Sequence, residues 1–287
     1  MKENRGIDHL VLAVRSLEKA APVYERLGFT LTPTAQHPWG TANRLVQLQG
    51  NFLELLAVAD PAKIPSAKAF SFGGFNKAFL KKREGFSMLV FAGNDARADQ
   101  AEFAAAGLQA YAPFDFSRKA KQPGGEEVTV GFSLAFVTDP RLPEAAFFTC
   151  QHHAPQHFWK PDYQRHANGA VAVREAIMVA DDPASLADLF ASLQGKDAVR
   201  ANVGQLIVIT ARGRVTVLDR QHAAARFGEA LPQGPQSPHF IGYRVAVADV
   251  AKTQAVLDKA GVRYRASAGA LQIPPADAFN TIIEFAA

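Results

Sequence analysis

The chain has 287 residues, of which 48% are hydrophobic, 20% are charged and one, Cys150, is a cysteine. This composition excludes a disordered or fibrous chain, and a lone cysteine excludes a disulfide framework and any site built from several cysteines. No window approaches the roughly 18 uninterrupted apolar residues that would span a bilayer, and residues 1–6 lack the apolar region of a secretion signal. We therefore expect a cytoplasmic protein without a membrane partner.

The formal net charge is +4, and basic residues cluster only locally, around residues 77–83 and 118–121. Neither cluster has the aromatic interleaving of an RNA-binding surface or a zinc-finger spacing, so we predict no nucleic-acid partner. A solvated basic face that attracts an anionic substrate fits better. The phosphate-binding patterns GxGxxG and GxxxxGK[ST] are absent, so we predict no nucleotide cofactor.

Four segments of the chain repeat one pattern, in which a short apolar strand precedes an amphipathic helix and further strands. In chain order, the strands and helices are predicted at 7–14 and 17–27, 86–92 and 96–106, 173–180 and 183–193, and 240–247 and 250–260. Each helix has an N-cap residue and a glycine just after its end. The N-caps are Ser16, Asp95, Asp182 and Asp249, and the glycines are Gly28, Gly107, Gly195 and Gly261. β-rich stretches follow at 44–58, 128–150, 206–218 and 281–285, so each segment is predicted to be a βαβββ module.

The modules pair naturally into two domains. Residues 151–172 interrupt the pattern and are rich in His, Pro, Gln and aromatic residues. We therefore predict an α+β protein with a first domain over 1–150, a linker over 151–172 and a second domain over 173–287. One helix per four strands leaves one sheet face bare, and pairing two modules turns that face into a cup for a ligand.

The most specific motifs lie in the first 60 residues. Residues 37–44 read HPWGTANR, between DHLV at 8–11 and FLELL at 52–56. These motifs resemble the glyoxalase-like domain type of the vicinal-oxygen-chelate superfamily, and the linker residues 158–169 resemble it too. The resemblance implies four βαβββ modules that form two glyoxalase-like domains, the second of them degenerate. It does not fix an activity, because the superfamily includes isomerases, ring-opening dioxygenases, epimerases, thiol transferases and binding proteins.

The resemblance also implies a metal site. In that superfamily the first and last strands of a module supply the ligands, and His9 and Glu54 occupy those positions here. An imidazole and a carboxylate suit Zn, Mn, Fe or Ni. The alternative is that the two side chains bond to each other or to substrate without a metal. Strand alternation places His9 on one face with Ile7 and Val11, and Asp8 on the other.

The second module offers weaker ligands, because Met88 and Thr149 align with His9 and Glu54. Neither suits a hard metal ion. Three candidates for a third ligand lie at or just after the last strand: Cys150, His152 and His153. The alternative is that they occupy solvated loop positions.

Residues 37–44 are the predicted substrate-binding segment. Arg44 is suited to grip a carboxylate or phosphate, and Gly40 lets the backbone approach a ligand closely. The other predicted contacts are His37, Trp39, Thr41 and Asn43. A tight turn with Arg44 in a surface ion pair is the alternative.

The second cup offers two carboxylates. Glu175 and Glu284 align with His9 and Glu54, and they are candidates for a shared proton or a hard-cation site. The alternative is a cup that has lost its chemistry and serves as scaffold.

We expect a small-molecule enzyme, specifically a metal-dependent lyase or isomerase that acts on a polar or anionic substrate with adjacent oxygens. His9 and Glu54 are the predicted catalytic residues and metal ligands, and the metal would polarise the substrate oxygens. Extradiol ring cleavage ranks lower because a second histidine ligand is not placed. The alternatives are a metal-free protein that sequesters a small molecule for resistance, and a scaffold that binds partners through basic patches. A monomer and a homodimer are both compatible with fused modules.

Overall fold

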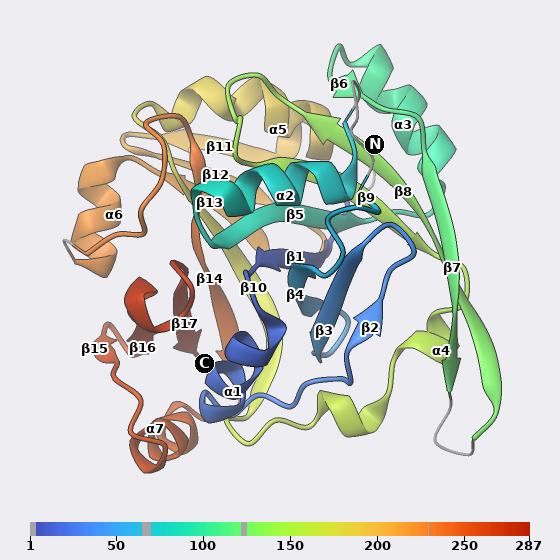
Figure 1. Ribbon diagram of the computed structural model, residues 1–287. Coiled ribbons are helices and arrows are strands. Elements are labelled where there is room, and N and C mark those ends of the chain that lie inside the picture. The colour runs from blue at the N-terminus through green and yellow to red at the C-terminus, as the bar shows by residue number, and fades with distance from the viewer. Residues whose placement is uncertain (1–3, 65–69, 122–124, 229) are drawn as a thin grey trace.

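The computed structural model describes residues 4–64, 70–121, 125–228 and 230–287, which form two β-sheets with associated helices (Figure 1). The first sheet has the order β2-β3-β4-β1-β5-β9-β8-β6, and β7 pairs with β8. Its strands are β1 (Ile7–Ala13), β2 (Ala35–Gln36), β3 (Thr41–Gln47), β4 (Phe52–Val58), β5 (Gly85–Ala92), β6 (Gln109–Ala110), β7 (Phe114–Lys121), β8 (Glu127–Thr138) and β9 (Ala146–His152).

The second sheet has the order β11-β12-β13-β10-β14-β17-β16-β15. Its strands are β10 (Ala170–Val179), β11 (Val199–Asn202), β12 (Gln205–Ile209), β13 (Arg214–Leu218), β14 (His239–Val247), β15 (Arg265–Ser267), β16 (Ala270–Ile273) and β17 (Ile282–Ala286). The helices are α1 (Leu17–Arg26), α2 (Phe72–Lys82), α3 (Ala96–Ala105), α4 (Pro155–Phe158), α5 (Ala187–Gln194), α6 (Arg220–Phe227) and α7 (Val250–Lys259), with short 3₁₀ turns η1 (Pro161–Gln164), η2 (Pro183–Leu186), η3 (Lys196–Ala198) and η4 (Pro275–Asp277).

The two sheets share one internal arrangement. In the first, β1 is antiparallel to β5, while β4 and β9 run parallel to β1 and β5. The second repeats this pattern with β10 and β14 at its centre and β13 and β17 beside them. The prediction of an α+β fold built from paired βαβββ modules is therefore confirmed.

The predicted N-caps explain where the repeated helices begin. The side chains of Ser16, Asp95, Asp182 and Asp249 each accept a hydrogen bond from a backbone amide of the following turn. Three helices were not predicted: α2, α4 and α6. The linker region also differs from the prediction, because β9 extends to His152 and β10 begins at Ala170.

One continuous apolar core joins the two sheets. It contains side chains from both sheets and from their helices. Phe86 of β5 stacks on Phe240 of β14 with ring centroids 4.0 Å apart, and Phe147 of β9 contacts Phe190 of α5. The opposite face of the first sheet has a separate aromatic cluster, and that face holds the pocket described below. The division into two domains remains a proposal, because the sheets are not separated by solvent.

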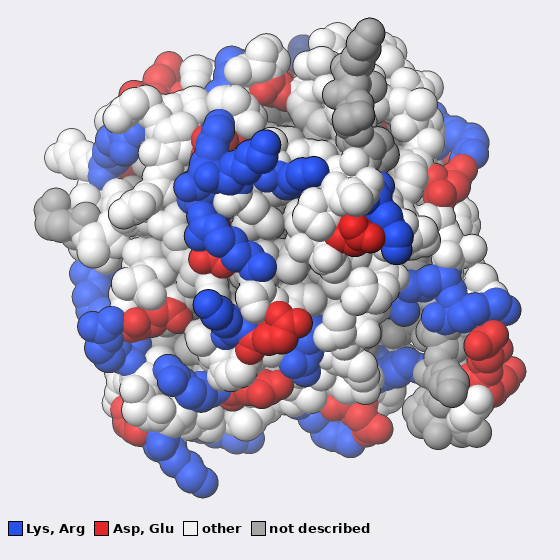
Figure 2. All heavy atoms as spheres, viewed as in Figure 1, with Lys and Arg blue, Asp and Glu red and all other residues white. Residues whose placement is uncertain are grey.

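Basic side chains gather on one face of the molecule (Figure 2), in the region where Figure 1 places α2. The last turn of α2 contains two lysines, Lys81 and Lys82. No helix among the described residues is long and apolar enough to cross a membrane. Residues 1–3, where we expect no secretion signal, lie outside the described part of the chain.

Candidate active site

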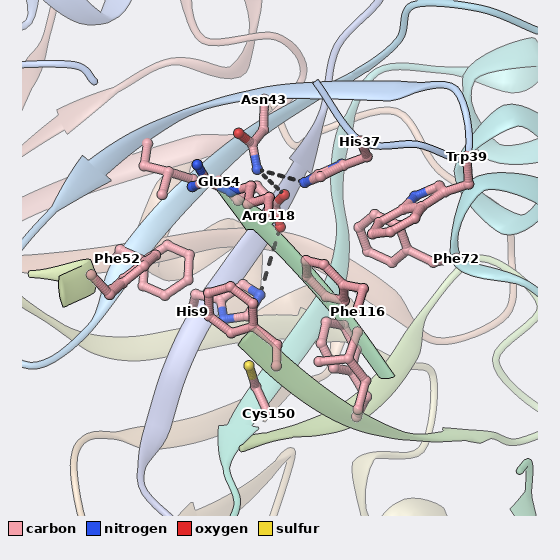
Figure 3. Close-up of a pocket in the computed structure, with 15 residues that line it drawn as sticks. His9, His37, Trp39, Asn43, Phe52, Glu54, Phe72, Phe116, Arg118 and Cys150 are labelled. Carbon is pink, nitrogen blue, oxygen red and sulfur yellow. Dashed lines mark hydrogen bonds and ion pairs between the residues drawn. The ribbon is translucent and has the colours of Figure 1, made fainter. Parts of the chain in front are cut away.

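His9 and Glu54 face one another on neighbouring strands. β1 and β4 run parallel, in a register that pairs His9 with Phe52 and Val11 with Glu54. His9 Nε2 lies 3.6 Å from Glu54 Oε2, and the two residues are only 4% and 6% exposed. The His9 ring also stacks on Phe52 at a centroid distance of 4.2 Å. The structure thus brings an imidazole and a carboxylate into one pocket (Figure 3).

Asp8 lies beside His9, and this corrects the alternation that the sequence predicted. A β-bulge between Ile7 and His9 breaks the alternation of β1. Ile7 therefore packs into the core between the sheets, whereas Asp8 turns toward the pocket face. Bulges of this kind re-aim side chains next to active sites.

Asp8 accepts hydrogen bonds from two histidines. His9 Nδ1 donates to Asp8 Oδ2 at 2.6 Å, and His152 Nε2 donates to the same oxygen at 3.3 Å. Burial raises the pKa of Asp8, but the hydrogen bonds from His152 and His9 outweigh it and hold the pKa well below its ordinary value. A carboxylate can only accept in this bond, so His9 Nδ1 carries the proton that is donated to Asp8, and Nε2 faces Glu54.

A chain of hydrogen bonds orients Glu54 from the other side. Asn43 Nδ2 donates to Glu54 Oε1 at 2.7 Å and to His37 Nε2 at 3.3 Å. His37 Nδ1 in turn donates to Thr41 Oγ1 at 2.8 Å. Burial lowers the pKa of His37, Glu54 opposes the shift and Arg118 adds to it, so His37 is neutral and accepts from Asn43. Glu54 Oε2 is left facing the pocket.

Aromatic side chains form most of the pocket wall. His37 stacks on Trp39, with centroids 4.7 Å apart. The remaining aromatic residues are Phe52, Phe72, Phe116, Phe132, Phe148 and Phe158. The cavity among them measures about 50 Å³, room for a few water-sized groups. Such a wall limits the entry of water around His9 and Glu54.

Four of the five residues predicted to bind substrate lie in or next to this pocket. His37, Trp39 and Asn43 line it, and Thr41 supports His37. Arg44 does not line it, because alternation along β3 turns it to the opposite face from Asn43. Its Nε donates to Thr32 O at 2.9 Å, and its guanidinium pairs with Glu25 at 3.3 Å. The alternative of a surface ion pair therefore describes Arg44, and we do not include it among the ligand contacts.

Arg118 is a pocket residue that the sequence analysis did not identify. It lies on β7, two positions after Phe116, and both residues line the pocket. Burial lowers the pKa of the Arg118 guanidinium and the charge of Glu54 opposes that shift, which places the two groups near each other. The alternation of Phe114, Phe116 and Arg118 was a period-two signal for one strand face.

The candidates for a third metal ligand lie in two different places. Asp8, Cys150 and His152 present ligand atoms that all lie within 4.8 Å of one another. Burial, with the charges of Asp8 and Glu54, raises the pKa of the Cys150 thiol well above its ordinary value. His153 instead contacts Ser133, with Nε2 2.7 Å from its Oγ.

The alignment of Thr149 with Glu54 does not hold in space. Phe148 and Cys150 of β9 line the pocket, so Thr149 points to the other face by alternation. Met88 lies in the aromatic cluster on the pocket side, where its sulfur accepts from Asn76 Nδ2 at 3.7 Å.

The second cup holds an ion-pair network. Glu175 and Glu284 are each 1% exposed, and Arg226 of α6 bonds to both, at 2.8 Å and 2.9 Å. Arg214 adds a contact to Glu175 at 3.1 Å, and Arg244 pairs with Glu284. Burial raises the pKa of Glu175, but its arginine and Thr216 partners lower it to about 2. Both carboxylates are therefore charged and paired with arginine, which does not support a shared proton or a hard-cation site.

The paired modules and the buried histidine–glutamate pocket define a protein of the vicinal-oxygen-chelate class. The glyoxalase-like domain family, Glyoxalase_3, matches residues 7–194, and the chain belongs to that family. Among curated proteins, none matches the sequence.

Similar solved structures confirm the fold. A hypothetical protein from Staphylococcus aureus superposes with a TM-score of 0.69 at 14% identity, over 98% of both chains. A mutant 4-hydroxymandelate synthase from Streptomyces coelicolor reaches 0.59 at 12% identity, over 99% of this chain and 92% of that one. A Mn(II)-bound glyoxalase from Novosphingobium aromaticivorans also reaches 0.59, at 11% identity over 99% and 82%.

Proposed function

We propose that this protein is a metal-dependent lyase or isomerase that acts on a small molecule with adjacent oxygen atoms. The observation that supports this most strongly is the position of His9 Nε2 and Glu54 Oε2, which lie 3.6 Å apart in a buried aromatic pocket.

The residues present fit a divalent cation. Nitrogen and oxygen ligands about 2.1 Å from a tetrahedral ion lie roughly 3.4 Å from each other, close to the observed separation. Asp8 on His9 Nδ1 supplies the carboxylate partner that metal-bound histidines commonly have. The Mn(II)-bound glyoxalase among the similar structures supports a divalent ion in general. When bound, such an ion would act as a Lewis acid on the substrate oxygens.

The protein's own groups position the ligand atoms. Because Asn43 donates a hydrogen bond to Glu54 Oε1, Oε2 is the oxygen of Glu54 that would hold the ion. Asp8 holds His9 in one orientation, and the aromatic wall excludes bulk water from the pair.

The proposal is tested by elemental analysis of the purified protein after incubation with Zn, Mn, Fe(II) or Ni and removal of free ions. We expect about one equivalent of metal in the wild type and in His222→Ala, which changes an exposed histidine. His9→Ala and Glu54→Gln should lose most of it. A wild type that retains none of the four metals would contradict the proposal and favour metal-free binding of a small molecule.

A further inference from the structure

Arg118 is a cation of the pocket that the proposed chemistry leaves unused. It is half-buried and lines both the inner pocket and a larger groove outside it. Within the described part of the chain, its guanidinium has no hydrogen-bond or ion-pair partner, and Glu54 acts on it only through space. A partly desolvated charge without a partner is unfavourable, so an anionic group on a ligand is its natural complement.

Asn43 presents a second unused atom at the same place. Its amide nitrogen is committed to Glu54 and His37, which fixes the orientation of the amide. Its Oδ1 is buried and has no partner among the described residues, and Figure 3 shows this oxygen turned away from His37. Asn43 also lines both the pocket and the groove. A hydroxyl donor on a ligand that enters from the groove can satisfy this oxygen.

The space around these two residues has two parts. The inner pocket measures about 50 Å³, whereas the groove measures about 970 Å³. Trp159, Tyr163 and Pro33 are among the apolar side chains along the groove. This division fits a ligand with a compact polar head and a larger apolar body.

We propose that the substrate is an α-hydroxy carboxylate with an apolar tail. Arg118 binds the carboxylate, Asn43 Oδ1 accepts the hydrogen bond of the hydroxyl, and the tail lies in the groove. One planar guanidinium matches one carboxylate in charge and geometry. The hydroxyl and carboxylate also provide adjacent oxygens, and the inference rests on the proposed function in taking the His9–Glu54 pocket as the substrate site.

The test is isothermal titration of metal-free protein with three probes: 3-phenyllactate, its uncharged amide, and 3-phenylpropanoate, which lacks the hydroxyl. The variants are Arg118→Met and, as matched control, Arg97→Met, whose exposed guanidinium pairs with Asp115 of β7 and lines neither the pocket nor the groove. We expect the wild type to bind phenyllactate about 10- to 100-fold more tightly than the amide. Arg118→Met should abolish that preference, and Arg97→Met should keep it.

Several results would overturn the inference. These are a wild type without preference for the acid, a preference that survives in Arg118→Met, or an equal loss in Arg97→Met. Equal affinity for phenyllactate and phenylpropanoate would remove the role of Asn43. Metal binding is measured separately, so an acid preference in a protein that binds no metal contradicts only the proposed function. A metal-binding wild type without acid preference contradicts only this inference.

Discussion

Asp8 determines which nitrogen of His9 is available in the pocket. The bulge in β1 brings its carboxylate to within 2.6 Å of His9 Nδ1, and the Nδ1 proton is then committed to that bond. The same carboxylate also holds His152. One buried anion thus orders two imidazoles on one side of the pocket.

This arrangement predicts the effect of Asp8→Asn on metal affinity. Removing the carboxylate partner of a metal-bound histidine lowers affinity about 10- to 100-fold, because the ring loses both its orientation and some basicity. Calorimetric titration with Mn(II) measures the change. Asp115→Asn, which alters an exposed carboxylate on β7, should leave affinity as in the wild type. Equal affinity for Asp8→Asn would argue against His9 as a ligand.

Because His239 is buried, we expect the folded protein to lose stability in acid. Burial lowers its pKa from 6.5 to about 4, Arg83 and Arg220 act in the same direction, and the Ser237 carbonyl and Glu144 oppose the shift. Between these two pH values the unfolded chain binds more protons than the folded one, so stability falls as the pH drops from about 6.5 to about 4. The contribution is about 3 kcal/mol.

Urea unfolding at pH 7 and pH 4 tests this contribution. His239→Gln should lose about 3 kcal/mol less than the wild type over that interval. His222→Gln, at an exposed histidine, should behave as the wild type does. Parallel losses in the wild type and His239→Gln would show that His239 is not the titrating group.

The pairing of His9 with Glu54 was predictable because the family resemblance places the two residues on the first and last strands of one module. Those strands, β1 and β4, are parallel neighbours in the first sheet. Asp8 was placed on the wrong face because a bulge has no reliable signal in one sequence. Arg44 was assigned to a binding loop because the sequence did not show that β3 already begins at Thr41. As a residue of this strand, Arg44 turns its side chain away from the pocket.

At the scale of elements, a polar N-cap and a terminal glycine made the four repeated helices predictable. The two signals are not sufficient, because α6 also begins after Asp219 and ends at Gly228 and was not predicted. The α2 sequence contains two glycines near its start, which weakens its helical pattern. β7 was missed because polar residues dominate its second half, yet it brings Phe116 and Arg118 to the pocket. Pairing with β8, which lies far along the chain from β1 and β4, is what positions them.

Arg226 connects α6 to two buried carboxylates of the second sheet. Arg226→Ala would leave two carboxylates that are 1% exposed without their shared partner. Breaking a buried ion pair in this way costs about 3–5 kcal/mol, which urea unfolding measures. Arg220→Ala on the same helix removes an exposed pair with Asp181 and should cost less than about 1 kcal/mol. Similar costs for the two variants would show that Glu175 and Glu284 do not need Arg226.

At the scale of the whole molecule, the common core predicts that the two sheets unfold together. Trp39 and Trp159, the two tryptophans of the chain, both lie near the pocket of the first sheet, and therefore report its unfolding. Phe240 belongs to the second sheet but stacks on Phe86 of the first. Phe240→Ala should lower the midpoint of the tryptophan transition, with a loss of about 3–5 kcal/mol.

Circular dichroism of the same samples provides the comparison. Its midpoint should coincide with that of tryptophan fluorescence in each variant, as expected for a cooperative transition. Ile209→Ala, at an exposed position of the second sheet, should leave both midpoints unchanged. If the midpoint of the tryptophan transition is the same in Phe240→Ala as in the wild type, the sheets are independent folding units.

The central claim is that a divalent ion binds between His9 and Glu54, and crystals soaked in Mn(II) test it most directly. Anomalous difference density should show one peak within about 2.3 Å of both His9 Nε2 and Glu54 Oε2. A peak among Asp8, Cys150 and His152 instead, or no peak in a pocket whose side chains are well ordered, would contradict the account.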